Sequence, residues 1–314
     1  MCNPNPVRVT SKNGITSQSN GKFPTGGTSS ALQRMTPLIL SGYIFNTLCY
    51  WTVFFLLPAS LTPAAEYCPQ NDTTNCTRRD LFAFQVVSFL NLSTLGLLGF
   101  YTFFISKRAS SALPQTPQGR YFGNRLGIGN KVLLPEADYI NAVIVIFQGW
   151  DFIGSIFVEE HCTMIMMTHH LLAFVCGFFC LYYEVSPYYA VYVGGVSEFS
   201  SIFLAIFQFF QYYPPSSLVA SASVLSSIFP AIETVCQGLF VLTFFIFRIV
   251  GWAYMTYMIL SDGSYVIKHG LLKRYCPGSG WFLWYLMTVA VLLGALQVFW
   301  FGEIAKRVLE VLGA

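Results

Sequence analysis

Charged residues are scarce in this sequence. Of its 314 residues, 17 are Lys or Arg and 14 are Asp or Glu, a share of 10%. Soluble proteins carry about 25% charged residues, which they need to cover their surface. The composition therefore excludes an ordinary cytosolic enzyme. No basic run is present that would build a nucleic-acid site, so no nucleic-acid partner is expected.

Long apolar segments take the place of the missing charge. Hydrophobic residues make up 54% of the chain, and Phe alone occurs 30 times. Crossing a bilayer takes about 20 apolar residues, and lipid cannot satisfy exposed backbone groups, so the expected form is helical. The expected spans are 37–61, 81–105, 138–157, 162–183, 187–210, 235–258 and 281–301. The sequence predicts an all-α, multi-pass helical membrane bundle of about seven transmembrane helices. Any number from six to eight spans remains open, because segment 218–234 is also typical of an interfacial or re-entrant segment.

The regions outside these spans set the expected domain boundaries. Residues 1–36 are polar and turn-rich with four basic residues and no acid, which is typical of a disordered cytosolic tail rather than a signal peptide. Residues 37–80 form a first transmembrane helix and a lumenal loop, and 81–301 form the main transmembrane domain. Residues 302–314 form a C-terminal extension, in which Ile304, Val308 and Leu312 recur at helical spacing.

The basic residues favour one orientation of the bundle. With seven spans, twelve Lys and Arg fall on the side of the tail and of loops 105–138 and 259–280, and four fall on the other side. Cytoplasmic loops carry the excess of Lys and Arg. We therefore expect an integral membrane protein with a cytosolic N-terminus.

Loop 62–80, on the expected lumenal side, carries extracytoplasmic signals. It holds two glycosylation sequons, at Asn71 and Asn75, and two cysteines, Cys68 and Cys76. The cysteines are close enough in sequence for a disulfide in an oxidising compartment. Sequons also occur by chance, and spacing does not prove a disulfide. We expect a glycoprotein with this disulfide, and both features agree with the orientation.

Five ionisable residues lie inside the expected spans, where each costs about 2.5–3.5 kcal/mol on insertion. A rise of 1.5 Å per residue places them ~9 to ~20 Å from the lumenal ends of their spans. At this rise per residue, all five lie at similar depths, within a layer about 10 Å thick that we call the belt. They are Asp151, His169, His170, Glu198 and Arg248. We predict that neighbouring helices point them at one interior site.

Each of these residues also has a purely structural interpretation. Asp151 and Glu198 can simply pair with Arg248 or a histidine to hold the bundle together. Two successive histidines lie about 100° apart on a helix, so at least one of them should face a polar interior. A neutral imidazole beside a carboxylate is suited to general base catalysis. No metal is expected, because helical ligand pairs sit at i, i+3 or i, i+4 and no His pair here does so.

Small residues accompany the belt. Span 187–210 carries Gly194, Gly195, Ser201 and Ala205 close to Glu198. Small residues allow close helix packing, and they also leave room for a chain-like ligand. We predict His169, His170, Asp151 and Glu198 as candidate catalytic residues. The candidate substrate-binding residues are Arg248, Ser201 and Gly194.

Three segments resemble the TLC domain. The segment 168–172, Thr-His-His-Leu-Leu, is similar to the paired-histidine helix of that domain, with Asp151 one helix earlier. The segment 195–204 resembles its next motif, in which an acid is followed by Ser two residues on. The Phe-rich segment 242–249 resembles the late helix that bears an arginine, here Arg248. The resemblance covers roughly 81–301. The TLC domain is shared by ceramide synthases, translocating-chain-associated membrane proteins and other TLC domain-containing proteins.

One departure separates this chain from the ceramide synthases. Those enzymes carry an Asp-x-x-Asp pattern after the histidines, where this chain has Glu198 and Ser201. The resemblance is therefore closest to the non-synthase TLC domain-containing branch. It implies an endoplasmic reticulum membrane and a lipid-linked role. If acyl transfer needs the second acid, that activity is absent here.

Two functions from different classes follow. The first is a lipid-related role, in lipid binding, sensing or membrane lipid homeostasis, with membrane lipids as partners and no cofactor. The second is a ceramide synthase-like N-acyltransferase, with acyl-CoA as co-substrate and one histidine as the base. The sequence leaves enzyme activity and oligomeric state open.

A seven-helix receptor and a transporter are less favoured. A retinal protein needs a lysine in its last span, and 281–301 contains none. A receptor needs its N-terminus outside, against the basic-residue counts. A transporter commonly shows inverted repeats, and no convincing internal similarity is visible.

Overall fold

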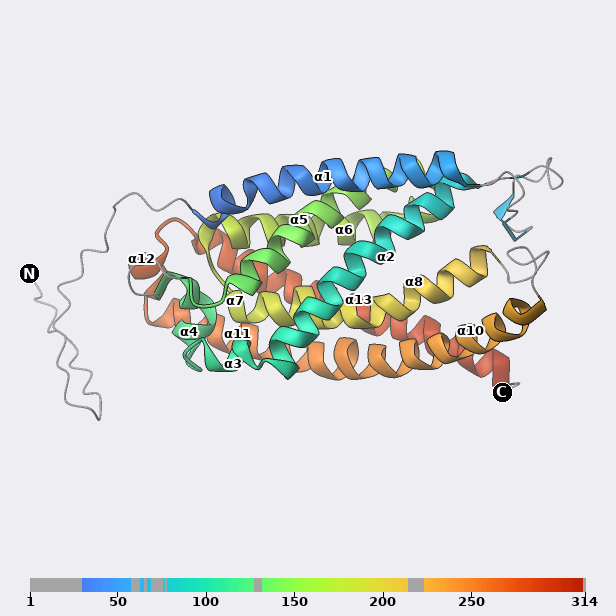
Figure 1. The fold of residues 1–314 in the computed structure, drawn as a ribbon. Coiled ribbons are helices and arrows are strands. Elements are labelled where there is room, and N and C mark those ends of the chain that lie inside the picture. The colour runs from blue at the N-terminus through green and yellow to red at the C-terminus, as the bar shows by residue number, and fades with distance from the viewer. Residues whose placement is uncertain are drawn as a thin grey trace, which may run out of the picture.

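The computed structural model describes residues 30–57, 63–64, 67–68, 76, 78–126, 132–213 and 223–312. These parts form a bundle of long helices with short helices at one end (Figure 1). The long helices are α1 (Ala31–Leu56), α2 (Arg79–Phe100), α5 (Pro135–Gly154), α6 (Met164–Tyr183), α8 (Phe199–Tyr212), α10 (Ser223–Thr243), α11 (Trp252–Lys268) and α13 (Gly280–Leu312). The short ones are α3 (Arg108–Ser111), α4 (Pro117–Phe122), α7 (Pro187–Tyr189) and α12 (Leu271–Tyr275).

Six helical segments of the described chain are long and apolar enough to cross a membrane. The expected multi-pass helical bundle is therefore confirmed. The expected span at 138–157 corresponds to α5, which has 20 residues and is not among these six. It nevertheless packs along both α1 and α6 inside the bundle. Asp151, near the end of α5, thus lies buried in the bundle.

Several helix ends differ from the expected boundaries. Helix α1 begins at Ala31 rather than at 37, because Ser30 and Gln33 form a capping box that satisfies the first backbone N–H groups. Helix α13 continues to Leu312, so that it runs through most of the expected C-terminal extension. Residues 1–29 of the expected tail lie outside the described residues.

The segment before 235 is not a re-entrant piece where the structure describes it. Helix α10 begins at Ser223 and leads without a break into the π-helical segment η8 (Phe244–Gly251) and α11. The apolar span Ile228–Lys268 is therefore one long helix. Helix α10 contains Pro230 as its eighth residue, which removes one backbone hydrogen bond from the helix.

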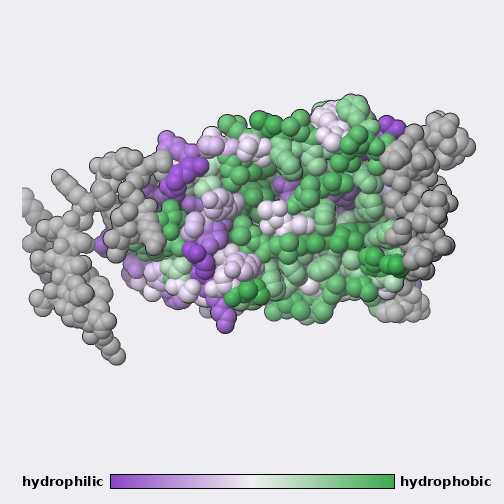
Figure 2. Space-filling view, in the orientation of Figure 1, coloured by the Kyte–Doolittle hydropathy of each residue, from purple (hydrophilic) through white to green (hydrophobic). Residues whose placement is uncertain are grey.

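The two ends of the bundle differ in character. Helices α3, α4 and α12, which carry the loops expected on the cytosolic side, gather at one end together with the start of α1 (Figure 1). We call this the basic end. Hydrophilic residues concentrate there, and an apolar surface covers the middle of the visible face (Figure 2). This pattern matches a bundle whose middle faces lipid.

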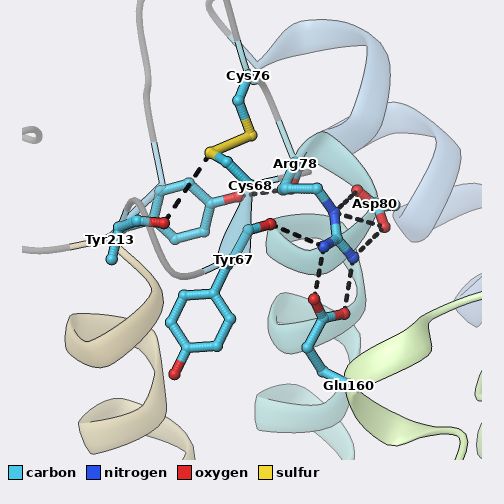
Figure 3. A network of polar contacts seen from close by, with 8 residues as sticks. Tyr67, Cys68, Cys76, Arg78, Asp80, Glu160 and Tyr213 are labelled. Atoms are coloured by element: carbon cyan, nitrogen blue, oxygen red, sulfur yellow. Dashed lines mark hydrogen bonds and ion pairs between the residues drawn. A yellow bond between two sulfur atoms is a disulfide. The ribbon is translucent and has the colours of Figure 1, made fainter. Parts of the chain in front are cut away.

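The opposite end holds the expected disulfide pair. Cys68 and Cys76 are joined as a disulfide with a Cα–Cα distance of 5.8 Å. Close by, Arg78 contacts Glu160 and Asp80 through its guanidinium, with a Nη2–Oδ2 distance of 2.9 Å to Asp80 (Figure 3). We call this the disulfide end. The sequons at Asn71 and Asn75 lie outside the described residues.

A close helix approach positions the middle of the bundle. Gly99 of α2 meets Gly195, so that a Cβ on either residue would overlap the backbone of the other. Gly195 ends a π-helical segment, η6 (Ala190–Gly195), which continues as a 3₁₀ turn, η7 (Val196–Glu198), before α8. Such irregular helix turns are frequent at functional sites. Here they place Glu198 at the junction.

Candidate functional site

The first polar cluster lies between α5 and α6. His170 is buried, and its Nδ1 lies 2.6 Å from Oε1 of Gln148. Its Nε2 lies 3.2 Å from Oδ2 of Asp151. Gln148 and Asp151 are one helical turn apart on α5, and so they flank the same imidazole. Gln148 thus fixes the ring of His170 through Nδ1, and Asp151 lies beside Nε2.

This arrangement defines where a proton lies. An amide oxygen only accepts, so the contact to Gln148 puts the proton of His170 on Nδ1. Nε2 then faces a carboxylate oxygen, and the pair is attractive only if a second proton lies between them. The contact lacks the alignment of a hydrogen bond, and both Nε2 and Asp151 Oδ1 have no hydrogen-bond partner. The pair therefore retains capacity to bind a polar ligand group.

The second polar cluster surrounds Arg248 on η8. Its guanidinium donates to Glu198 Oε2 at 2.7 Å and to Ser201 Oγ at 2.6 Å. Ser201 in turn donates to Glu198 at 2.8 Å. Its Nε donates to the Ser197 carbonyl and to Ser200, and its Nη1 donates to Gln297. Arg248 and Glu198 thus neutralise each other within a nearly complete network.

His169 lies between the two clusters. Its ring centroid is 5.4 Å from that of His170 and 5.4 Å from that of Trp300 on α13. Its Nδ1 is buried and has no hydrogen-bond partner. A second buried nitrogen without a partner, Gln297 Nε2, belongs to the Arg248 cluster. Unpaired buried polar atoms are rare in folded proteins, and those of Asp151, His169 and His170 lie beside one hollow.

That hollow is a cavity of about 1240 Å³. Asp151, both histidines, Glu198 and Arg248 all line it, as does Ser201. The rest of the wall is largely apolar and aromatic, with Phe147, Leu204, Phe207, Phe240, Phe244, Phe245 and Phe301. The cavity extends from the polar clusters toward the disulfide end, where residues at the end of α13 line it. Its size and lining suit a lipid-sized ligand.

A smaller cavity of about 100 Å³ continues toward the basic end. It shares Gln148, His169 and Glu198 with the large cavity. Gly194 lines this smaller space and not the large one. On the basic-end side it reaches Ser186, which precedes α7. Gln148, His169 and Glu198 thus lie between a large and a small cavity.

The structure brings the predicted belt together. All five ionisable residues, from α5, α6, η7 and η8, line one cavity, although their roles remain predictions. The structural interpretation also holds in part, because Glu198 pairs with Arg248 and Asp151 contacts His170. Within the described residues, no group of three His, Cys, Asp or Glu side chains could hold a metal ion.

Three polar residues of the site were missed in the sequence. Gln148 and Gln297 are uncharged, and the cost of placing a charge in lipid points only to ionisable residues. Both amides are buried inside expected spans. Gln148 could have been predicted from its spacing, because it lies three residues before Asp151 and so on the same helix face. His161 was overlooked because it falls between two expected spans, yet it also lines the cavity.

Comparison with known proteins assigns the chain. The model of the TLC domain, which includes the TRAM, LAG1 and CLN8 proteins, matches residues 81–306. The chain belongs to the TLC domain family. The match begins inside α2 and ends inside α13, so the TLC domain contains every residue of both polar clusters. No curated protein and no solved structure matches the chain.

Ser201 stands where the ceramide synthase pattern has its second aspartate. In this TLC domain the serine has a structural role. Ser201 bridges Glu198 and Arg248 by two hydrogen bonds. An aspartate at this position would place a second acid beside the one arginine of the cluster. With serine at 201, the single negative charge of Glu198 balances the single positive charge of Arg248, so the network is neutral.

Proposed function

We propose that this TLC domain binds a membrane lipid in the large cavity and acts in lipid sensing or membrane lipid homeostasis. The observation that carries the proposal is the junction of an apolar cavity of about 1240 Å³ with unpaired polar atoms at its inner end. The acyl chains would lie along the Phe-rich wall. A polar group of the lipid would face Asp151, His170 and His169.

The electrostatics favour binding of a polar but uncharged group at the inner end. The Arg248 network is already neutral, and Asp151 and His170 share a contact. A carbonyl or hydroxyl needs only one donor or acceptor, and it avoids the large cost of burying a new charge. An ester, amide or hydroxyl of a lipid fits this requirement.

The test is lipid retention by purified protein in native mass spectrometry. We expect the wild-type chain to retain a lipid that His170→Ala and Asp151→Asn hold less well. His269→Ala is the matched control, because His269 lies at the basic end and stacks on Tyr265, away from the cavity. Equal retention by all four proteins, or no retained lipid, would reject the proposal.

The second candidate is an N-acyltransferase of the ceramide synthase type. The contact between His170 and Asp151 favours it, since a carboxylate beside an imidazole is the usual arrangement of a general base. The amine nitrogen would attack the acyl-CoA carbonyl while the imidazole accepts its proton. The N–C bond forms, the C–S bond breaks, and the CoA thiolate leaves and takes up a proton. Gln148 would orient the ring through Nδ1, and Nε2 would be the base. Glu198 is held by Arg248, so Asp151 is the acid that would stabilise the imidazolium once Nε2 has taken up the proton.

An activity assay separates the two candidates. Purified protein is incubated with a long-chain acyl-CoA and a panel of long-chain amines, and N-acyl product is measured. Product that disappears in His170→Ala establishes the enzyme. Retained lipid without product from any amine supports the binding function.

We also propose an endoplasmic reticulum location with the basic end in the cytosol. The loops with excess Lys and Arg gather at that end, and the disulfide lies at the other. Protease protection of an N-terminal epitope in sealed microsomes tests this. Digestion of the epitope from outside supports it, and protection contradicts it.

A further inference from the structure

The wide end of the large cavity carries charged side chains that neither polar cluster uses. Glu233 of α10 lines it, and so do Glu303 and Arg307 of α13. Glu303 and Arg307 are four residues apart, so they share one face of α13. Gln237 donates to Glu233 at 3.3 Å from the next turn of α10. We call Glu233, Glu303 and Arg307 the cavity mouth.

The mouth charges have no partner of opposite sign. Among the described residues, the ion pairs within 4 Å involve none of the three. All three nevertheless line the same largely apolar cavity as the histidines. Glu303 and Arg307 could have paired along the helix but do not, and so both remain able to contact a ligand.

The position of the mouth matches a membrane interface. Glu233 lies near the start of the apolar span Ile228–Lys268, and Arg307 lies near the end of the span Gly280–Glu310. Both ends belong to the disulfide end of the bundle (Figure 1). Arg307 is seven residues beyond Trp300, which contacts His169, so it lies ~10 Å outward from the histidines at 1.5 Å per residue. The mouth is therefore at headgroup depth while the polar clusters are within the membrane.

We infer that the cavity mouth is a headgroup site for a zwitterionic phospholipid. This inference rests on the proposed lipid-binding function. Arg307 matches the phosphate, because a guanidinium binds phosphate through paired hydrogen bonds. Glu233 and Glu303 match the positive amine beyond it. The chains then run inward along the Phe-rich wall.

Charge complementarity decides among lipid classes. The three mouth residues sum to one negative charge, which disfavours an anionic phospholipid that lacks an amine. A diacylglycerol has no charge for any of the three to contact. A lipid with both a phosphate and an amine satisfies each of them, and electrostatic complementarity of this kind mainly sets specificity.

The experiment is competitive binding measured by native mass spectrometry on delipidated full-length protein. Four lipids with identical acyl chains are offered together, with phosphoethanolamine, phosphocholine, phosphoglycerol and free hydroxyl head groups. We expect the two zwitterionic lipids to occupy the protein in preference to the other two. The ratio of ethanolamine to choline lipid reports how far a primary ammonium is favoured over a quaternary one.

Two variants test the assigned roles. Arg307→Gln should lower the preference for zwitterionic lipid over diacylglycerol by about three- to tenfold, as expected for loss of one partly exposed charge contact. Glu233→Gln with Glu303→Gln should reverse the preference toward the phosphoglycerol lipid. The matched controls are Lys306→Gln and Glu310→Gln, which remove charges from the same helix outside the cavity lining. Both should keep the wild-type preference.

The outcomes separate this inference from the proposed function. Lipid that is retained without headgroup preference, or an Arg307→Gln effect equal to that of Lys306→Gln, overturns the headgroup site and leaves lipid binding intact. Absence of any bound lipid overturns both. Thermal unfolding of each variant is measured alongside, and a preference change at an unchanged Tm assigns the effect to the mouth.

Discussion

Nη2 of Arg248 and Oε2 of Glu198 lie 2.7 Å apart inside the TLC domain, and Ser201 hydrogen-bonds to both residues. This pair joins η8 to the junction between η7 and α8. Its charges hold these helices together. In the proposed function, Asp151 and the histidines are the polar groups that contact the lipid.

The first prediction concerns this pair. Arg248→Met leaves Glu198 buried without its partner, which typically costs about 3–5 kcal/mol. Adding Glu198→Gln to Arg248→Met should restore part of that loss, with a coupling energy of about 1–3 kcal/mol. The free energy of unfolding is measured by SDS titration in mixed micelles for the two single variants and the double variant. Strictly additive losses would show that the two side chains do not support each other.

The second prediction concerns the crossing of α2 with η6. Gly195→Ala should destabilise the protein, by about 1–3 kcal/mol, because its Cβ meets the backbone of Gly99. It should also lower lipid retention, since the displaced segment leads to Glu198. Gly302→Ala is the control, because a Cβ there meets no atom within 4 Å. Equal Tm values for the two variants would contradict the close approach.

The third prediction concerns pH. Burial lowers the pKa of His161, which lies between α5 and α6, to about 4 from the ordinary value of 6.5. The unfolded chain then binds a proton more readily than the folded chain, so stability falls as the pH drops from 6.5 to about 4. Above that window His161 is neutral in both states and contributes no slope.

His161→Gln tests this dependence. The variant should lose stability less steeply than the wild type over the same pH window, by at most about 3 kcal/mol. Tm is recorded for both proteins at a series of pH values, and the readout is the difference between the curves, since other groups titrate in both. Parallel curves would mean that His161 titrates alike in the folded and unfolded chain.

The fourth prediction concerns the disulfide end. The bond between Cys68 and Cys76 closes a loop with a sequence separation of 8. Replacing both cysteines by serine should cost about 2.5 kcal/mol in a chain-entropy treatment. Intact mass should show two fewer hydrogens in the wild type than in its reduced form. Free thiols at both positions in freshly purified protein would contradict this pairing.

Much of the fold could be predicted because apolar length is a strong signal. A stretch such as 81–105 has few other uses than a membrane helix, and α2 with its π-helical end spans Arg79–Ile105. The helix starts were harder to place. The start of α1 depends on the capping box of Ser30, a local feature that hydropathy does not report. The lead-in at 218–234 was ambiguous because its Ser and Ala residues suit either a helix or a surface piece.

The site was predictable to the extent that charge is costly in lipid. Asp151 and Arg248 are conspicuous in apolar spans, and a common depth suggested a common cavity. The pairing of Glu198 with Arg248 rather than with a histidine depends on the rotation of the helices. That rotation is set by the irregular turns η6 and η7, which have no reliable sequence signature. Gln148 and Gln297 carry no charge, so this criterion could not find them.

The central claim is that a lipid occupies the large cavity. Ala205 is buried and lines this cavity, so Ala205→Phe places a ring inside it. Ala253→Phe is the matched control, because Ala253 is exposed on α11 and does not line the cavity. The decisive measurement is the lipid occupancy of wild type and both variants in native mass spectrometry. We predict that the wild type and Ala253→Phe retain lipid while Ala205→Phe loses it; equal occupancy of all three, or none in any, would contradict the account.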